Sequence, residues 1–381
     1  MEGYPVSLTI WLSARTLKHS TAGGHFWVYL NWALGLHALG CKVVWLEPID
    51  HNTSVLEART MVDVLKSRLE PYGLDKCLAL CSWTSEPISS DVSEGCLDLE
   101  DIGKADLFLN LAYGIPLTVV GRFRRSALVD IDPGLTQIWL SKRQMSVARH
   151  DMYFTIGETV GQNGARFPDC GLDWQYTSPC VALDWWPICP APLGATFTTV
   201  SSWWMNEWVE DADGWYRNDK RSGYLPFLDL PHHTTQPLEL ALCLNGEETE
   251  RATLLERGWK LREAWEGTST PWDYQRYIQG SLGEFSCVKP SCVRLQNAWI
   301  SDRTLCYLAS GKPAVVQHTG PSRFLPDAAG LFRFRNLDEA VRDLDIVAAD
   351  YDQQCRLARA LAEEHFDARK VVQRVLERSI A

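Results

Sequence analysis

Short apolar runs alternate with amphipathic segments along the first half of the chain. Residues 6–13, VSLTIWLS, form an apolar run that is typical of a buried parallel strand. Apolar residues then recur every three or four positions from Phe26 to Leu36, as in a helix, and Gly40 ends this pattern. A second apolar run follows at 42–46, so this region is predicted to form a βαβ unit.

The alternation continues and then breaks once. A helix is predicted at 55–69, and strands are predicted at 107–111 and 127–131. Between about 187 and 223 the sequence is instead rich in Pro, Gly and Trp, which indicates a domain boundary. A new first strand is predicted at 196–203.

The second half alternates again and ends in a long helical segment. Strand–helix alternation is typical of parallel sheets that carry helices on both faces. The sequence therefore predicts an α/β fold of two doubly wound, Rossmann-like domains facing a cleft, at 1–190 and 191–355. Ligands of such sheets bind at the carboxyl ends of the strands. The pattern predicts strands at 238–244 and 314–317, helices at 251–257, 272–281, 302–309 and 337–344, and helical structure from 348 to 380.

Composition restricts the class of protein. The 381 residues exceed the usual size of one hydrophobic core, and 46% apolar with 22% charged residues is typical of a globular chain. Lys and Arg number 37 against 48 Asp and Glu, and the net charge of -11 argues against a nucleic-acid partner. The 17 Trp residues suit binding of sugars or aromatic molecules, although a large core also uses Trp.

Cysteine spacing and the N-terminal segment favour a cytoplasmic protein. The 12 Cys residues include no CxxC pair, so zinc-site spacing is absent. The N-terminal segment lacks the basic region and cleavage site of a secretory leader, and no uninterrupted apolar run reaches membrane-spanning length. We therefore expect reduced thiols, a cytoplasmic location and no membrane span.

Residues 297–320 hold the clearest candidate for a ligand site. Ser301 or Asp302 is a suitable N-cap for the helix predicted after it, which ends at Gly311. The N-terminus of a helix facing the cleft can bind an anion, and Arg303 in its first turn can add a bidentate phosphate contact. Without further context, an ordinary capped helix with a surface Arg is the more frequent explanation of such a pattern.

The same region carries a resemblance to a known family. The run LASGKPAVV at 308–316, followed by Thr319 and Gly320, resembles the donor-binding segment of nucleotide-sugar glycosyltransferases of the GT-B fold. The sequence AGGH at 22–25 is similar to the family's glycine-rich loop, which faces the donor phosphates and the acceptor. The resemblance implies that the N-terminal domain binds the acceptor and the C-terminal domain the donor. It also implies that a C-terminal helix, 356–381, packs back on the N-terminal domain.

The chain departs from both standard signatures of that family. In the retaining branch a pair of glutamates spaced E-x7-E precedes the motif glycine, and these positions are Ala298 and Cys306 here. In the plant-type inverting branch a His begins the donor motif, and that position is again Ala298. The resemblance therefore implies a divergent branch and does not assign the stereochemistry.

His25 is the candidate general base of an inverting transfer. Inverting enzymes of the resembling family have a His in the same loop, and a near-neutral pKa suits abstraction of the acceptor's proton. The alternative is a His that caps the following helix or packs against the sheet. His19 and Glu158 are second candidates for the catalytic base, Glu158 because it follows a predicted strand.

The other candidate residues would bind the donor or the acceptor. Glu284 suits sugar or ribose hydroxyls and Lys289 suits a phosphate, although both also fit a solvated loop. Asp130 and Asp132 form a DxD triplet that could hold a metal, but the Pro-Gly after it favours a turn at the cleft rim, with Asp132 near the acceptor. No metal site is predicted. The predicted donor set is Gly23, Gly24, Glu284, Lys289, Ser301, Asp302, Arg303, Thr304, Gln317, Thr319 and Gly320, and the predicted acceptor set is Asp132, Trp203 and Trp204.

These patterns together predict a hexosyltransferase that needs neither a metal nor a cofactor. A UDP- or dTDP-sugar is the expected donor, and a small-molecule natural product or saccharide is the expected acceptor. We expect a monomer or homodimer with no nucleic-acid partner. Two alternatives stay open: a GT-B-fold sugar-nucleotide epimerase or hydrolase, and a non-catalytic domain pair that binds a nucleotide or a protein.

Overall fold

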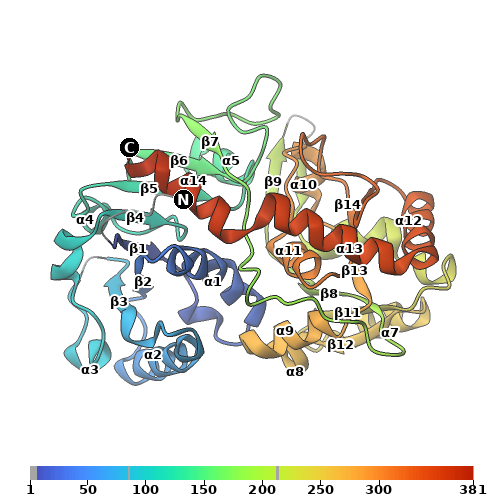
Figure 1. Ribbon diagram of the computed structural model, residues 1–381, viewed down its shortest axis with the longest axis horizontal. Coiled ribbons are helices and arrows are strands. Elements are labelled where there is room, and N and C mark those ends of the chain that lie inside the picture. The colour runs from blue at the N-terminus through green and yellow to red at the C-terminus, as the bar shows by residue number, and fades with distance from the viewer. Residues whose placement is uncertain (1–6, 85, 212–213, 381) are drawn as a thin grey trace. The chain divides into compact units, whose positions relative to one another are not determined.

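The chain divides into two compact units, each built on its own parallel sheet (Figure 1). The computed structural model describes residues 7–84, 86–211 and 214–380. The first unit comprises Met1–Gly161, Phe167–Ala182 and Asp367–Ala381, and the second comprises Gln162–Arg166 and Leu183–Phe366. The α/β class predicted from the alternating pattern is confirmed. Among the helices of the described residues, none has the length and apolar character that crossing a membrane requires.

The first unit is a seven-stranded parallel sheet in the order β3-β2-β1-β4-β5-β6-β7. Its central strands are buried almost throughout, because helices cover a doubly wound sheet on both faces. Residue 6 of the predicted first strand lies outside the described residues. The strands are β1 (Thr9–Ser13), β2 (Lys42–Ile49), β3 (Leu78–Ser82), β4 (Leu107–Asn110), β5 (Ser126–Asp130), β6 (Met152–Thr155) and β7 (Trp174–Tyr176), and the helices are η1 (Leu17–His19), α1 (Gly23–Ala38), α2 (Val55–Leu69), η2 (Glu70–Tyr72), η3 (Asp75–Cys77), α3 (Ser90–Ser93), η4 (Leu99–Lys104), α4 (Leu117–Val120), α5 (Leu135–Ser141) and α14 (Ala368–Ile380).

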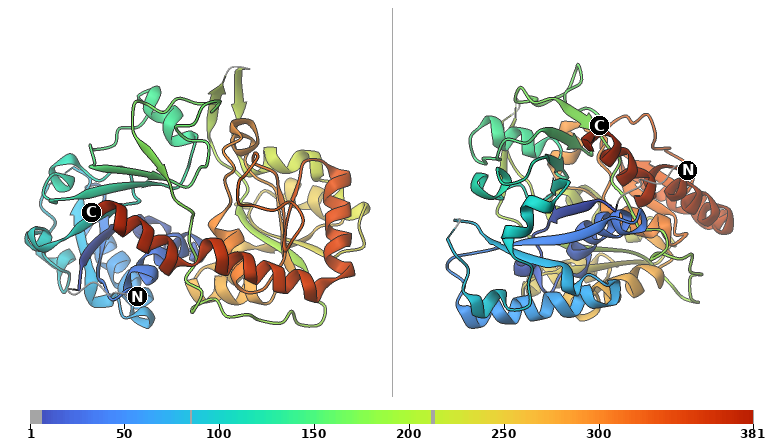
Figure 2. Two further views of the ribbon diagram at one scale, coloured as in Figure 1. Left: turned by 45° about the horizontal axis from the view of Figure 1, so that its top comes forward. Right: turned by 60° about the vertical axis from the view of Figure 1, so that its left-hand side comes forward.

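Helix α14, at the end of the chain, belongs to the first unit and packs against α1. Figures 1 and 2 both show α14 in red beside α1 in blue. A Cβ on Gly35 of α1 would lie 2.9 Å from the Cβ of Ala368, so the two helices approach closely. The tail is not one helix from 348 to 380, because the backbone of Asp350 leaves the helical region and Ala362–Phe366 forms a π-helical turn. Only the last helix, rather than the whole expected segment 356–381, lies in the first unit.

The second unit is a six-stranded parallel sheet in the order β12-β11-β8-β13-β14-β15, with a separate two-stranded hairpin. The predicted helix at 302–309 and strand at 314–317 are confirmed with the same bounds. The strands are β8 (Phe197–Ser202), β9 (Trp208–Asp211), β10 (Gly214–Arg217), β11 (Leu238–Cys243), β12 (Lys260–Glu263), β13 (Gly283–Ser286), β14 (Ala314–Gln317) and β15 (Leu331–Phe334), and the helices are α6 (Lys220–Tyr224), η5 (Leu225–Phe227), η6 (Leu230–His232), α7 (Glu248–Glu256), α8 (Ala264–Thr268), α9 (Pro271–Gln279), α10 (Pro290–Leu295), α11 (Asp302–Ala309), α12 (Leu337–Ala349), α13 (Tyr351–Leu361) and η7 (Ala362–Phe366).

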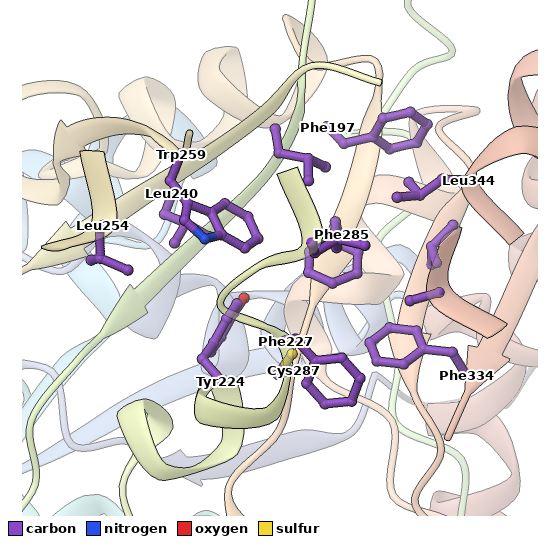
Figure 3. Packing of buried hydrophobic residues seen from close by; sticks show 14 of the residues in the cluster. Phe197, Tyr224, Phe227, Leu240, Leu254, Trp259, Phe285, Cys287, Phe334 and Leu344 are labelled. Atoms are coloured by element: carbon purple, nitrogen blue, oxygen red, sulfur yellow. The ribbon is translucent and has the colours of Figure 1, made fainter. Parts of the chain in front are cut away.

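Aromatic residues fill the core on one face of this second sheet (Figure 3). The rings of Phe285 and Phe334 are stacked with their centres 5.3 Å apart, and Phe227 meets Phe334 edge-on at 5.0 Å. Trp203 belongs to the same cluster and has no exposed surface. Part of the unusual tryptophan content therefore serves the core, as large aromatic side chains commonly do.

Helix α6 touches the loop after β13 so closely that only glycine fits at the contact. A Cβ on Gly223 would lie 1.9 Å from the carbonyl oxygen of Val288. We expect Gly223→Ala to lower the free energy of unfolding by about 1–3 kcal/mol, because backbone must shift to relieve the overlap. Urea unfolding measures this loss. Gly103→Ala is the control, since an added Cβ there meets nothing within 4 Å, and equal stability of the two variants would contradict the contact.

Candidate functional site

The candidate anion site lies at one edge of the second sheet. Strands β8, β13 and β14 are neighbours in that sheet and run parallel, so their carboxyl ends share an edge. Helix α11 begins directly after Ser301, whose Oγ accepts a hydrogen bond from the Arg303 N–H at 3.3 Å. The positive end of the helix dipole is therefore at Ser301–Thr304, as predicted from the N-cap.

Two loops join each other beside the start of α11. The Ala298 N–H donates to the Thr319 carbonyl at 3.0 Å, and the Thr319 hydroxyl donates to the Trp299 carbonyl at 2.6 Å. Gly320 has φ of +126°, and a Cβ there would lie 2.6 Å from the Gln296 carbonyl oxygen. Gln296 and Ala298 themselves have positive φ, which is uncommon for residues other than glycine. Thr319 and Gly320 thus hold the loop in shape, a role the sequence analysis did not assign to them.

The end of β14 is also fixed by the predicted donor residue Gln317, and by His318 and Arg333, which were not among the predicted site residues. The Gln317 Oε1 accepts from the Val288 N–H at 3.0 Å, which links β14 to the segment after β13. His318 Nδ1 accepts from the Gly320 N–H at 3.1 Å, and Arg333 Nη1 donates to the Gly320 carbonyl at 2.9 Å. Burial, together with nearby positive charge including Arg333, lowers the pKa of His318 to about 4. His318 is therefore neutral and acts as an acceptor that holds the loop.

Arg303 is buried and paired within the protein, which corrects the prediction of a bidentate phosphate ligand. Its Nε donates to Glu284 Oε1 at 2.8 Å, and its Nη1 donates to the Val200 carbonyl at 3.0 Å. Glu284 has no exposed surface, so it is not a solvated loop residue either. The pair joins α11 to β13 and β8, and its guanidinium adds positive charge near the start of α11.

Lys220 is the cation that sequence reasoning missed. It begins α6, where the N-cap Asp219 accepts from the Ser222 N–H at 2.8 Å, and its Nζ donates to the Cys287 carbonyl at 3.1 Å. Burial first, and the charge of Arg303 next, lower the pKa of Lys220 to about 8. The only local sign in the sequence is an Asp suited to capping just before a Lys, a pattern too common to point to a ligand.

Asp302 and Lys289 complete the charged groups of this edge. Burial raises the pKa of the Asp302 carboxyl, while the positive charges of Arg303 and Lys220 oppose that rise. Lys289 Nζ lies 3.3 Å from Glu207 Oε2 and 3.2 Å from the Met205 sulfur. The predicted phosphate ligand Lys289 therefore already has a carboxylate partner, whereas Lys220 is held by a neutral carbonyl.

The Gly-Gly-His segment of the first unit is the first turn of α1 rather than a loop. His25 Nε2 donates to the Arg15 carbonyl at 2.8 Å, because a carbonyl can only accept, and Nδ1 is therefore the nitrogen with a lone pair. The His19 ring meets His25 edge-on at 4.6 Å. Burial lowers the pKa of His25 to about 4; the hydrogen bond to the Arg15 carbonyl opposes this shift, and the charges of His19 and the Arg15 side chain add to it. The near-neutral pKa expected for His25 is thus wrong, and the ring is uncharged at physiological pH.

A buried carboxylate holds the segment that precedes α1. Glu47 on β2 has no exposed surface and accepts hydrogen bonds from the Thr16 N–H at 2.9 Å and from Trp45 Nε1 at 3.0 Å. The Leu17 N–H and the Thr16 hydroxyl also donate to it. Burial raises the pKa of Glu47 in spite of these donors. This carboxylate positions the turn that carries Arg15, whose carbonyl accepts the hydrogen bond from His25. No sequence motif predicted this role of Glu47.

The DxD triplet ends β5 as a turn. Asp130 is fully buried and accepts from Thr136 Oγ1 at 2.7 Å and Thr155 Oγ1 at 2.9 Å, while Asp132 is exposed. A Cβ on Gly157 would lie 2.4 Å from the Cβ of Pro133, so the turns that carry Asp132 and Glu158 are packed together. Across the described residues, no three His, Cys, Asp or Glu side chains gather as a metal site would need.

The two predicted acceptor tryptophans have different positions. Trp203 is completely buried in the core of the second unit, and its Nε1 donates to Glu250 at 2.9 Å. It cannot contact an acceptor, because the core packing covers it, so that prediction is wrong. The Trp204 ring lies under the guanidinium groups of Arg217 and Arg221, at 5.5 Å and 5.3 Å from its centre.

Comparison with known proteins shows likeness in fold but none in sequence. No protein-family model matches the chain, and no curated protein sequence matches it. Solved structures do match along nearly the whole chain. HepE from Anabaena in complex with UDP and glucose is 11% identical, with 97% of this chain and 99% of that chain covered and a TM-score of 0.55.

Two further structures agree with that result. A glycosyltransferase from Rickettsia africae is 10% identical over 99% of this chain and 98% of its own, with a TM-score of 0.56. An alpha-glucosyltransferase in complex with UDP and a 13-mer DNA is 10% identical over 98% of this chain and 100% of its own, with a TM-score of 0.60. The chain therefore shares its fold with these glycosyltransferases, the GT-B fold.

Proposed function

We propose that this protein transfers a hexose from a nucleotide diphosphosugar to an acceptor. The observation that carries the proposal is the gathering of Lys220 and the N-terminus of α11 at the carboxyl edge of the second sheet. A helix N-terminus with a neighbouring cation is suited to a diphosphate. The shared fold supports this, because structures with that fold hold UDP or UDP-glucose.

The donor would be held through its diphosphate. In this proposal Lys220 Nζ pairs with a phosphate oxygen, and the first-turn amides at Ser301–Thr304 donate to the same group. The Arg303 guanidinium stays paired with Glu284 and adds positive charge near the start of α11. These groups stabilise the diphosphate as it departs, so transfer is expected without a metal ion.

His25 is the proposed general base of an inverting transfer. Its Nε2–H is held by the Arg15 carbonyl, so Nδ1 can accept the proton of the acceptor hydroxyl. A pKa of about 4 keeps the ring neutral over the physiological range, so the Nδ1 lone pair is available, but it makes His25 a weaker base than a His of near-neutral pKa. Glu158, in the turn after β6, is the second candidate for this role.

The acceptor is proposed to be a natural product or a saccharide, and the donor a UDP- or dTDP-sugar. One structure with the shared fold contains DNA. The net charge of -11 disfavours a nucleic-acid acceptor here, because a phosphate backbone is bound through excess positive charge. We further propose a cytoplasmic monomer or homodimer.

Replacing Lys220 tests the donor site. We expect Lys220→Gln to weaken UDP binding about tenfold or more, because a charge-assisted contact to phosphate is lost. Isothermal titration of metal-stripped protein with UDP and dTDP measures the change. The control is Lys260→Gln, on β12 at the opposite, amino-terminal end of its strand, and it should bind UDP as the wild type does.

The same contact predicts a pH dependence with a definite sign. Lys220 is charged below its pKa of about 8 and loses its charge above it. UDP affinity should therefore fall as pH rises beyond 8. The second ionisation of a phosphate, near pH 6, is already complete there, so it does not contribute to this fall. Lys220→Arg should abolish this fall, because Arg stays protonated. An unchanged pH profile in that variant would remove Lys220 from the site.

Two assays separate the transferase from the alternatives. A sugar-nucleotide epimerase or hydrolase converts the donor alone at full rate, whereas a transferase accelerates when the acceptor is added. A non-catalytic domain pair converts nothing and is insensitive to changes at His25. Failure of both UDP and dTDP to bind the folded wild type would contradict the donor site itself.

A further inference from the structure

The hairpin of β9 and β10 interrupts the second unit between β8 and α6. Trp208 lies opposite Arg217, and Glu210 lies opposite Trp215. Opposite residues of an antiparallel pair share a face, as do alternate residues of one strand. Trp208, Glu210, Trp215 and Arg217 therefore form one face, called the tryptophan face here. Figure 2 shows the hairpin in yellow-green projecting from its unit.

The opposite face of the hairpin is fixed to the body of the second unit. Val209 is 2% exposed, and the Arg294 guanidinium lies 4.5 Å from the centre of the Tyr216 ring. Arg294 also pairs with Asp211, with Nε to Oδ2 at 2.6 Å and Nη2 to Oδ1 at 2.7 Å. A bidentate ion pair and a cation–π contact hold an element in one orientation. The tryptophan face is thus presented by an anchored hairpin.

The tryptophan face places two large aromatic rings in solvent. Trp208 is 54% exposed and Trp215 is 59% exposed. The two residues are diagonal neighbours across the strand pair, with about 7–8 Å between their backbone positions. Val209, on the other face, is the residue of the hairpin that is buried against the unit, whereas more than half of each indole surface is exposed. Exposed aromatic side chains grouped on one face are typical of a binding surface.

We propose that the tryptophan face binds a carbohydrate chain whose sugar rings stack on Trp208 and Trp215. The C–H groups on one side of a pyranose ring pack against a flat indole, and Trp offers this area at a small cost in side-chain entropy. Glu210 and Arg217 on the same face can accept and donate hydrogen bonds at sugar hydroxyls. The offset between the two indoles suits successive rings of a chain better than a single monosaccharide.

Charge on and around the hairpin favours a neutral carbohydrate over a polyanion. Glu210 lies on the tryptophan face, Asp211 is next to it, and the whole chain carries a net charge of -11. Arg217, the basic residue of the face, is paired with Asp219 at 2.6 Å. A nucleic acid or an anionic membrane would meet repulsion here, because both are bound through clusters of Lys and Arg.

The inference rests on the proposed transferase function in one respect, namely that the carbohydrate chain is the acceptor. Only Asn218 and Asp219 separate the hairpin from Lys220, the proposed phosphate ligand. A chain on the tryptophan face is therefore held by the same unit that binds the donor. Binding of the carbohydrate requires no transfer, so the two proposals can fail independently.

Isothermal titration of the full-length protein with maltotetraose, cellotetraose, chitotetraose and mannotetraose tests the inference. We expect at least one of these to bind, with affinity reduced about tenfold or more in Trp208→Ala and in Trp215→Ala and lost in the double variant. Trp208→Phe keeps a flat ring and should bind within a few-fold of wild type. Trp265→Ala is the matched control, because Trp265 on α8 is 58% exposed in the same unit.

Titration of each variant with UDP separates this inference from the proposed function. Unchanged UDP affinity in the double variant assigns the lost carbohydrate binding to the tryptophan face. No UDP binding by wild type would contradict the donor site and leave the tetrasaccharide result standing. The inference is overturned when no tetrasaccharide binds, when the double variant binds like wild type, or when only a 12-mer of thymidine or phosphatidylglycerol vesicles bind through Trp208 and Trp215.

Discussion

His25→Gln is expected to lower kcat by about 10²–10⁴-fold while UDP affinity stays within a few-fold of wild type. This range is what positioned general bases contribute, and the loss follows because Gln has no group that can take the acceptor's proton. The Gln side chain can still donate to the Arg15 carbonyl, which is the hydrogen bond that His25 Nε2 makes. The fold of the preceding turn, held by Glu47, should therefore survive.

The measurement is steady-state transfer from UDP-hexose to the acceptor, with kcat and kcat/KM determined over a range of pH. Wild-type kcat/KM should hold from pH 8 down to about pH 5 and fall as pH approaches 4, because His25 is protonated below its pKa of about 4. Protonated His25 cannot accept a proton, so the sign of the effect is a loss on the acid side. The variant should lack that acid limb.

Two controls make the result specific to His25. His37→Ala changes an exposed His in the last turn of the same helix and should leave kcat unchanged. His19→Gln removes the edge-on neighbour of His25 and tests the second His of the segment. The role of general base would belong to His19 or Glu158 if the His25 variant kept the wild-type kcat and the variant of that other residue lost it.

Arg303→Met is expected to lower the free energy of unfolding by about 3–5 kcal/mol. The substitution leaves Glu284 buried without its cationic partner, and an uncompensated buried charge is costly. An exposed ion pair would contribute no more than about 1 kcal/mol, so the size of the loss distinguishes a buried pair from an exposed one. Glu284 has no exposed surface, and Arg303 also supports the Val200 carbonyl.

Chemical unfolding of the single and double variants measures this coupling. Arg303→Met combined with Glu284→Gln removes the charge on both sides and should recover a large part of the lost stability. Arg333→Met is the comparison variant. Arg333 is also buried, but its carboxylate partner Asp327 is exposed, and the substitution removes the hydrogen bond to the Gly320 carbonyl. A loss under 1 kcal/mol for the Arg303 variant would show that the pair is not buried in solution.

Local sequence determined the elements of the candidate site. The helix of residues 302–309 is capped at Ser301 and ends before Gly311, whose φ is +68°. The residues that start and end this helix are therefore adjacent to it in the sequence. The apolar run at 314–317 is likewise short and bounded. Propensity misled at Gly23 and Gly24, which begin α1 although Gly disfavours helix, because tertiary packing outweighs that preference.

Partners across the sheet could not be predicted from these local signals. Arg303 lies in the first turn of α11, where its position in the sequence suggests a surface residue, and only the packing of α11 on β13 brings it to Glu284. Lys220 lies far along the chain from α11, and only the tertiary contact of its Nζ with the Cys287 carbonyl, after β13, brings it near Asp302 and Arg303. The same is true of Glu47, which holds the turn before α1 from a neighbouring strand.

The tryptophans show most clearly the difference between what local sequence patterns predict and what depends on the folded structure. Local patterns were enough to predict a fold of parallel α/β sheets and a capped helix that starts near residue 301, and the abundance of tryptophan is a property of the composition. Trp203 and Trp208 stand in one stretch of similar composition, yet the first is completely buried and the second is 54% exposed. This difference arises in the folded chain, because exposure depends on which residues from distant segments pack against a side chain, and local periodicity does not contain that information.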